Sequence, residues 1–165
     1  MTTPSAWHPT EVRRVVRPLA TGAETVIVET DSGTGYLKAM GNCGGEHILA
    51  CEWVATQLAR WFGLPTFDFA LIEVRDEDGI VFYGGTPARP GPAFITRKER
   101  GQSWGTRRRQ LQRVVNQDDI TRLVVFDTWT RNWDRYSADG KRQNYDNVFL
   151  SEEAPPGQFL LKAMD

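Results

Sequence analysis

The feature that most constrains this chain is an ordered series of oxygen-bearing side chains in its second half. Asp134 follows a predicted helix, Asn147 precedes the apolar run 148–150, and Asp165 follows a second apolar segment. An Asp that orients a hydroxyl group, followed by two oxygen ligands suited to Mg²⁺, is the set that phosphoryl transfer requires. Each residue also has a plain structural interpretation: Asp134 as a helix-ending residue, Asn147 as a turn residue and Asp165 as a chain terminus.

Bulk composition limits the classes of protein to which this sequence can belong. A chain of 165 residues fits one domain or two small lobes and can bury a real core. Its net charge of -1 does not single out nucleic acid or a membrane as a partner. We expect no membrane span, because no apolar run is long enough, and no signal peptide. Cys43 and Cys51 lack metal-ligand spacing, so we expect a cytoplasmic protein without a disulfide framework.

The N-terminal half is predicted to form strands around one helix. The predicted strands are residues 12–19, 25–30, 35–40, 67–74 and 80–83, the last two joined by a turn at 76–79. Residues 46–62 are predicted to form a helix that ends at Gly63, before Pro65. Its expected core stripe consists of Ile48, Cys51, Ala55, Leu58, Ala59 and Phe62.

The second half is predicted to begin with helices and to end with a small hairpin. Helices are expected at 106–115 and 119–130, the second capped by Asn116 or Asp118. Strands are expected at 148–150 and 158–162. The proline-rich segment 87–92 marks the expected lobe boundary, which gives a nucleotide-binding lobe at residues 1–92 and a second lobe, with the hinge and the catalytic loop, at 93–165. The sequence therefore predicts an α+β fold.

Lys38 and Glu52 form a candidate pair in the first half. Lys38 ends an alternating strand segment, where a lysine can present a point charge to phosphate oxygens. Glu52 lies at the edge of the apolar helix face, where a carboxylate is costly unless a cation meets it. A strand lysine held by a helix glutamate is the kinase arrangement. The alternative is that both side chains are solvated and never meet.

The turn that begins with Thr21 and Gly22 is a candidate phosphate-covering loop. Neither G-x-G-x-x-G nor G-x-x-x-x-G-K-[ST] occurs in the sequence, so a Rossmann or Walker-type loop is not indicated. The backbone N–H groups of residues 21–24 can still cover phosphates. The same residues are equally suited to a plain hairpin turn.

Seven basic side chains gather between residues 97 and 113, with one acid, Glu99, among them. They are Arg97, Lys98, Arg100, Arg107, Arg108, Arg109 and Arg113. Such a patch can bind nucleic acid or a phosphorylated substrate. In a charge-balanced chain a solvated helix face is the commoner explanation, so nucleic acid is not the partner that we expect.

Two stretches of the sequence carry a family resemblance. The first runs from Gly35-Tyr36-Leu37-Lys38 through Glu52-Trp53-Val54-Ala55 to Gly63-Leu64-Pro65. The second joins Asn132-Trp133-Asp134-Arg135 to Asn147-Val148-Phe149-Leu150. They resemble the strand lysine, the helix glutamate, the Gly-Leu-Pro exit and the N-x-D-R-H-x-x-N catalytic loop of the HipA-like kinases, a bacterial family related to protein kinases and phosphatidylinositol 3/4-kinases.

The resemblance implies a protein-kinase-like fold, with an N-lobe sheet and one helix followed by the first part of a helical C-lobe. It implies binding of ATP and Mg²⁺ and phosphate transfer to a protein Ser/Thr hydroxyl or, as a second choice, to a small hydroxyl substrate. The implied roles are phosphate contact for Lys38, orientation of Lys38 for Glu52, the phosphate loop for Thr21 and Gly22, catalysis for Asp134, and Mg²⁺ binding for Asn147 and Asp165.

The sequence departs from the family pattern in three places. Tyr136 stands where the family usually has His, and the loop from Asp134 to Asn147 is longer than the compact motif, which makes Asn144 a rival of Asn147 as metal ligand. The sequence also ends at Asp165, where relatives continue through a helical lobe. We therefore expect self-association or a partner chain at this lobe. The alternative function is a truncated, non-catalytic module of kinase fold that binds a nucleotide or a partner.

Overall fold

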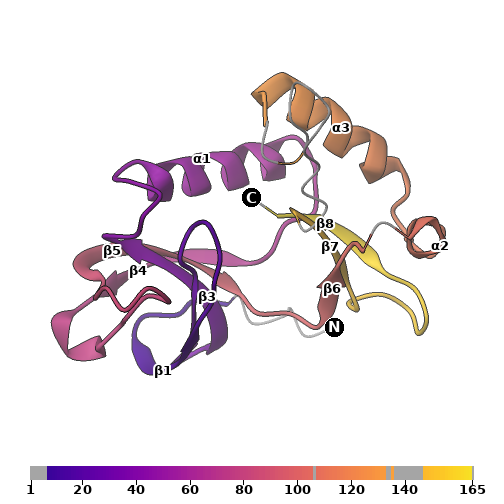
Figure 1. The fold of residues 1–165 in the computed structure, drawn as a ribbon. Coiled ribbons are helices and arrows are strands. Elements are labelled where there is room, and N and C mark those ends of the chain that lie inside the picture. Colours follow the sequence, from indigo (N-terminus) through magenta and orange to yellow (C-terminus); the bar gives the residue numbers. More distant parts are fainter. Residues whose placement is uncertain (1–6, 106, 133–134, 136–146, 165) are drawn as a thin grey trace. The chain divides into compact units, whose positions relative to one another are not determined.

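The computed structural model describes residues 7–105, 107–132, 135 and 147–164, which form an α+β protein (Figure 1). The chain divides into two compact units. Unit 1 comprises residues 1–54 and 68–98, and unit 2 comprises residues 55–67 and 99–165. A division into two lobes between residues 92 and 93 stays a prediction.

Unit 1 is built on a five-stranded antiparallel sheet (Figure 1). Its strands are β1 (Val12–Pro18), β2 (Val26–Thr30), β3 (Gly33–Met40), β4 (Phe69–Val74) and β5 (Arg89–Arg97), in the spatial order β1-β2-β3-β5-β4. The sheet is the N-lobe-like sheet that the sequence predicts. Leu37 and Ala39 of β3 join Val26 and Val28 of β2 in an apolar core. Because successive side chains of a strand point to opposite faces, Lys38 points away from that core.

Helix α1 (Ile48–Trp61) confirms the predicted helix, and it begins in unit 1 and ends in unit 2. Its first half covers the sheet face that bears Lys38, where Trp53 contacts Phe69 edge to face with ring centroids 5.2 Å apart. The expected core stripe is partly wrong: Cys51 and Ala55 are exposed, whereas the Glu52 side chain is only 12% exposed. The helix turns this carboxylate inward because Lys38 meets it there.

Helix α1 ends at the glycine that the sequence predicts as its terminator. The N–H of Leu64 donates to the carbonyl of Ala59 (2.9 Å), and the N–H of Gly63 donates to the carbonyl of Arg60 (3.0 Å). Gly63 has a φ of 83°. These two bonds and the left-handed residue between them form a Schellman motif, in which glycine avoids a steric cost.

The predicted strand at residues 80–83 is wrong. Strand β4 pairs with β5 and not with this segment, which instead bends back through an isolated bridge between Val81 and Pro87. The expected turn before it contains the 3₁₀ helix η1 (Asp76–Asp78). Ile80 and Phe82 are nevertheless buried in the core of unit 1. Alternate side chains of this segment are therefore buried without the pairing of a regular strand.

Unit 2 combines a three-stranded antiparallel sheet with helices (Figure 1). Its elements are the second half of α1, β6 (Gly101–Ser103), α2 (Arg108–Leu111), α3 (Asp118–Thr130), β7 (Val148–Ser151) and β8 (Leu160–Ala163). Leu123 and Phe126 of α3 pack with Leu150 of β7 and Leu161 of β8. The predicted hairpin and the predicted helix at 119–130 are confirmed.

Three details of unit 2 differ from the sequence prediction. The helix expected at 106–115 is only the four residues of α2, because the N–H of Val115 bonds the carbonyl of Phe159 instead (2.9 Å). Asn116 does not cap α3 but exchanges two hydrogen bonds with the backbone of Leu161. Strand β6 was not predicted. Its Gly101 approaches the partner strand so closely that a Cβ atom would lie 2.4 Å from the carbonyl oxygen of Leu150.

None of the helices in the described part of the chain is long and apolar enough to cross a membrane.

Candidate functional site

One group of candidate residues is an ion pair inside unit 1. The Lys38 ammonium lies 2.5 Å from Oε1 of Glu52, and the two side chains are 9% and 12% exposed. Lys38 comes from β3 and Glu52 from α1. The predicted pairing of these residues is therefore confirmed, and the alternative of two solvated side chains is excluded.

The environment of this pair explains why it forms. Lys38 faces Phe94 across the ladder between β3 and β5, and Phe94 packs against Phe69 with ring centroids 5.7 Å apart. The pair thus lies next to aromatic side chains and is largely shielded from bulk water. A buried charge without a partner costs several kcal/mol, so each group requires the other.

The turn at Thr21 and Gly22 is tied to the glycine-rich loop before α1. The thiol of Cys43 donates to the carbonyl of Gly22 (3.2 Å), and the N–H of Cys43 donates to the Glu24 carboxylate (2.7 Å). The hydroxyl of Thr21 accepts a hydrogen bond from the N–H of Thr25 (3.0 Å). Two loops of unit 1 are therefore held together, although a role in phosphate binding stays a prediction.

A separate cluster of buried polar groups lies in unit 2, around Arg135. The guanidinium donates to Oδ1 of Asp127 (2.5 Å), to the carbonyl of Asn147 (3.2 Å) and to the carbonyl of Met164 (2.6 Å). The side chains of Arg135 and Asp127 are 9% and 15% exposed. Burial raises the pKa of the Asp127 carboxyl above its usual value, and the hydrogen bond from Arg135 offsets part of that rise.

Sequence reasoning missed the pairing of Arg135 with Asp127, although a signal for it exists. Asp127 lies one turn after the buried Leu123 and beside the buried Phe126 of α3. A carboxylate near the apolar face of a helix is costly unless a cation meets it, which is the argument that identified Glu52. Applied to α3, the same argument would have led to Arg135.

Three of the predicted residues lie outside the described part of the chain. They are Asp134, Asn144 and Asp165. Asn147 is described and is buried, at the start of β7. Among the described residues, no group of three or more His, Cys, Asp or Glu side chains gathers in a way that could hold a metal ion. The expected Mg²⁺ ligands therefore stay a prediction.

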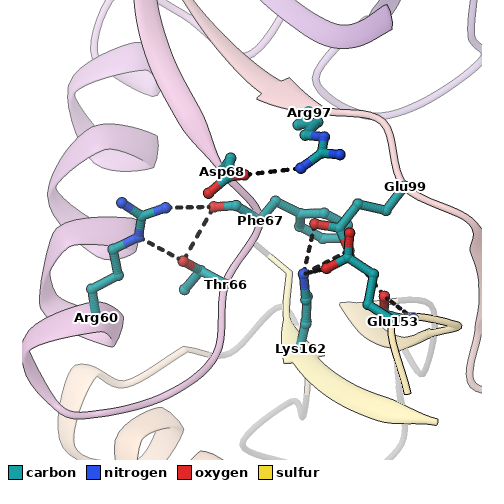
Figure 2. A network of polar contacts seen from close by, with 9 residues as sticks. Arg60, Thr66, Phe67, Asp68, Arg97, Glu99, Glu153 and Lys162 are labelled. Carbon is teal, nitrogen blue, oxygen red and sulfur yellow. Dashed lines mark hydrogen bonds and ion pairs between the residues drawn. The ribbon is translucent and has the colours of Figure 1, made fainter. Parts of the chain in front are cut away.

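A second buried lysine, Lys162 of β8, was also missed by the sequence analysis (Figure 2). Its ammonium lies 2.6 Å from each carboxylate oxygen of Glu99 and 3.0 Å from Oε2 of Glu153. The Glu99 side chain is only 2% exposed and also accepts a hydrogen bond from the Ser151 hydroxyl (3.0 Å). This cluster ties the segment after β5 to the sheet of unit 2.

Comparison with known proteins identifies the family of the chain. A family model described as HipA-like kinase matches residues 12–155. The chain belongs to the HipA-like kinase family. The matched range contains β3, α1 and the whole of α3, which are the elements that position Lys38, Glu52 and Asp127. No curated protein and no solved structure matches the chain.

The described residues include some of the groups that this family implies. Lys38 is a cation held in place by Glu52, and a fixed cation is a kind of group that can contact phosphate. The side chain of Asn147, just before β7, carries an amide oxygen, a ligand type that Mg²⁺ accepts. The chain is therefore a kinase-like protein, and its use of a nucleotide and a metal stays a prediction.

Proposed function

We propose that the chain is an ATP- and Mg²⁺-dependent phosphotransferase that acts in the cytoplasm on a protein Ser/Thr hydroxyl. A small hydroxyl substrate is the second choice for the acceptor. The family membership supports phosphate transfer as the reaction. The observation that carries the proposal is the buried ion pair between Lys38 and Glu52.

A buried ion pair of this kind is poor evidence for stability alone. Moving two charges out of water costs about as much as their attraction returns, so an apolar pair of similar volume would serve a fold equally well. A strand lysine fixed by a helix glutamate is, however, what the β- and α-phosphates of a nucleotide require. The pair is therefore better explained by ligand binding than by folding.

Each residue has a distinct task under this proposal. Bound Mg-ATP supplies the transferable phosphoryl group. Lys38 holds the α/β-phosphates and Glu52 fixes the direction of the ammonium group. The turn at Thr21 and Gly22 covers phosphate oxygens with its backbone N–H groups.

The remaining candidate groups belong to the second half of the chain. Asp134 accepts the proton of the attacking hydroxyl and orients it. Asn147 and Asp165 offer oxygen ligands for Mg²⁺. If Asn144 takes the metal instead of Asn147, Asn144→Ala and not Asn147→Ala will reduce the response of the protein to Mg²⁺.

The test compares two glutamates of unit 1 that both form ion pairs. Glu52→Gln removes the charge that orients Lys38, and Glu29→Gln removes the charge of an exposed pair with Arg14. We expect Mg-ATP to raise the melting temperature of the wild type and of Glu29→Gln by mass action, and to raise that of Glu52→Gln much less. ATP-dependent ³²P labelling of the purified chain, alone and with cell extract, measures the transfer itself.

The outcomes of this test separate the two functional classes. A wild-type protein that shows no thermal shift at millimolar Mg-ATP would argue against nucleotide binding. A thermal shift combined with labelling that Asp134→Asn does not change would support nucleotide binding but not phosphate transfer by this chain. Equal shifts in Glu52→Gln and Glu29→Gln would remove Glu52 from the site.

A second candidate function, a partner-binding module, has support from one specific observation in unit 2. Trp61 and Trp129 are 78% and 56% exposed, their ring centroids lie 6.4 Å apart, and Val125 beside them is half-exposed. Exposed apolar groups of this size mark interaction surfaces. We propose that this surface mediates self-association or the binding of a partner chain. Trp129→Ser should then shift the sedimentation coefficient toward that of a monomer, and a monomeric wild type that captures no partner would contradict this candidate.

A further inference from the structure

Helix α2 of unit 2 presents three consecutive arginines to solvent (Figure 1). Arg107 directly precedes the helix, Arg108 and Arg109 begin it, and all three are exposed. Among the residues that the structure describes, no acid forms an ion pair with any of them. Arg122 of the next helix differs, since its guanidinium lies 2.9 Å from Oδ1 of Asp119. The positive charge of α2 therefore has no neutralising carboxylate in the described part of unit 2.

The one acid of this basic segment is withdrawn from the surface. Glu99 is the single Asp or Glu between residues 97 and 113. Its side chain is 2% exposed, and the Lys162 ammonium bonds both of its oxygens at 2.6 Å. The three guanidinium groups of α2 repel one another, and no other acid of the segment offsets that repulsion. The surface therefore fits negative charge from another molecule better than it fits a salt-bridged helix face.

The backbone that carries the arginines is fixed on both sides of α2. Before the helix, the N–H of Trp104 donates to the carbonyl of Val148 on β7 (2.8 Å), and its indole N–H donates to the carbonyl of Arg107 (3.3 Å). After the helix, the N–H of Phe159 donates to the carbonyl of Arg113 (3.0 Å). A partner that docks here orders side chains and not backbone, which lowers the entropic cost of binding.

The surroundings of α2 favour a protein partner over nucleic acid. Single-stranded nucleic acids stack on exposed aromatic side chains. Trp104 is the aromatic residue of the segment 97–113, but it packs on the core of unit 2 and its indole N–H is already bonded. The whole chain has a net charge of -1, whereas domains that bind nucleic acid are commonly strongly basic. A short acidic peptide requires only the local charge of α2.

We propose that Arg107, Arg108 and Arg109 form a docking surface for an acidic segment of a partner protein. Each guanidinium presents a planar fork of N–H donors that matches the two oxygens of a carboxylate. Three such groups suit a segment that carries several Asp or Glu side chains. The contact requires neither a nucleotide nor phosphate transfer, and it therefore goes beyond the proposed function.

The experiment measures peptide binding to the full chain by fluorescence anisotropy. The probes are a fluorescein-labelled oligoglutamate and an oligoglutamine of the same length. We expect the chain to bind oligoglutamate and not oligoglutamine, and to bind less tightly as the ionic strength rises. The triple variant Arg107→Gln, Arg108→Gln, Arg109→Gln should lose about 10-fold in affinity, because each exposed ion pair contributes a modest part of the binding free energy.

Strand β1 of unit 1 offers a matched control with the same change in net charge. Arg13, Arg14 and Arg17 are also exposed and lie close together in the sequence. Two of them already have acidic neighbours, since Arg13 lies 3.6 Å from Glu11 and Arg14 lies 2.6 Å from Glu29. We expect replacement of these three arginines by Gln to leave the affinity for oligoglutamate unchanged.

Single variants cover the case in which the triple variant of α2 does not fold. Arg108→Gln and Arg109→Gln each remove one exposed guanidinium and leave the other two in place. We expect each to weaken binding of oligoglutamate by about 2-fold. Arg14→Gln is the matched single control and should not weaken it.

Four results would overturn this proposal. The first is a wild-type chain that binds no oligoglutamate, or that binds oligoglutamine equally well. The second is a folded α2 variant with wild-type affinity. The third is an equal loss in the β1 variant, which would show a general effect of net charge. The fourth is a single-stranded oligonucleotide of the same charge that binds more tightly than oligoglutamate and depends on the same arginines, which would assign the surface to nucleic acid.

Discussion

Each unit of the molecule buries one lysine from a β-strand, and the two lysines have different partners. Lys38 in unit 1 pairs with Glu52 on a helix, and both side chains retain about a tenth of their surface exposed. Lys162 in unit 2 bonds both oxygens of Glu99 and one oxygen of Glu153. The neighbours of both lysines along their strands, Leu37 and Leu161, belong to the apolar cores.

The difference lies in how completely the partner carboxylate is used. Glu99 is 2% exposed, and Lys162 and the Ser151 hydroxyl together occupy its oxygens. Such a carboxylate has a structural role, because it connects the segment after β5 to strands β7 and β8. Glu52 comes from a helix of the family's matched region and pairs with Lys38, for which we propose the role of the strand lysine of kinases. A buried strand lysine therefore does not by itself indicate a functional site. Its ion-pair partner and its position in the family's sequence pattern are needed to interpret it.

The largest effect that we expect in this comparison is the loss of Lys162. Lys162→Ala should lower the free energy of unfolding by about 3–5 kcal/mol, because it leaves a fully buried Glu99 without its cation. Lys38→Ala should cost less, since Glu52 is more exposed and can regain water. Urea unfolding measures both values, and a greater loss in Lys38→Ala would reverse the structural ranking of the two pairs.

The second expected effect is a difference between the two ion pairs in how Mg-ATP changes the stability of the protein. At a Mg-ATP concentration of 100 times Kd, the wild type should gain about 2.7 kcal/mol of stability. We expect Lys38→Ala to lose this gain and Glu99→Gln to keep it. Thermal unfolding with and without Mg-ATP measures the gain for each protein. A gain that disappears only in Glu99→Gln would place nucleotide binding in unit 2 and would contradict the proposed role of Lys38.

The third effect tests whether burial is what makes these pairs important. Arg14 and Glu29 lie 2.6 Å apart on neighbouring strands, but their side chains are 66% and 45% exposed. Arg14→Ala should change the free energy of unfolding far less than Lys38→Ala does, because water competes for both charges. A loss as large as that of Lys38→Ala would show that burial does not distinguish the pairs.

The smallest effect concerns the left-handed residue other than glycine that the structure describes in each unit. Arg131 at the end of α3 has a φ of 54°, and Glu24 in the turn of unit 1 has a φ of 48°. Arg131→Gly should raise stability by about 0.5–1 kcal/mol, because glycine adopts this conformation without steric cost. Glu24→Gly should not, because it also removes the acceptor for the Cys43 N–H. Equal gains in the two variants would show that this contact contributes nothing.

The sequence predicted most of the fold because its strongest patterns are local. The strand segment around Lys38, the helix that ends at Gly63 and the terminal hairpin all appear in the structure. It failed where distant contacts decide the outcome. Gly101 pairs with Ser151 across 50 residues, and Val115 leaves its predicted helix to bond Phe159. No window of sequence contains both members of such a pair.

The same limit applies to the site. Lys38 and Glu52 could be predicted as a pair because one strand and the following helix hold them. Arg135 contacts Asp127 nearby, but its other partners, Asn147 and Met164, are brought to it by the hairpin. Lys162 and Glu99 lie 63 residues apart and gave no local signal. The sequence therefore identified the candidate groups, but not the buried cations that hold their segments in place.

The division of α1 between two units has a consequence for synthesis on the ribosome. The sheet of unit 1 is complete once residue 97 has emerged, and its hairpin between β2 and β3 closes over a turn of two residues. The second half of α1 emerges before that, but its apolar partners in β7 and β8 follow more than 80 residues later. The entropy of closing so long a loop delays this contact. Ala59, Phe62 and Leu64 therefore leave the ribosome well before the residues of β7 and β8 that pack against them.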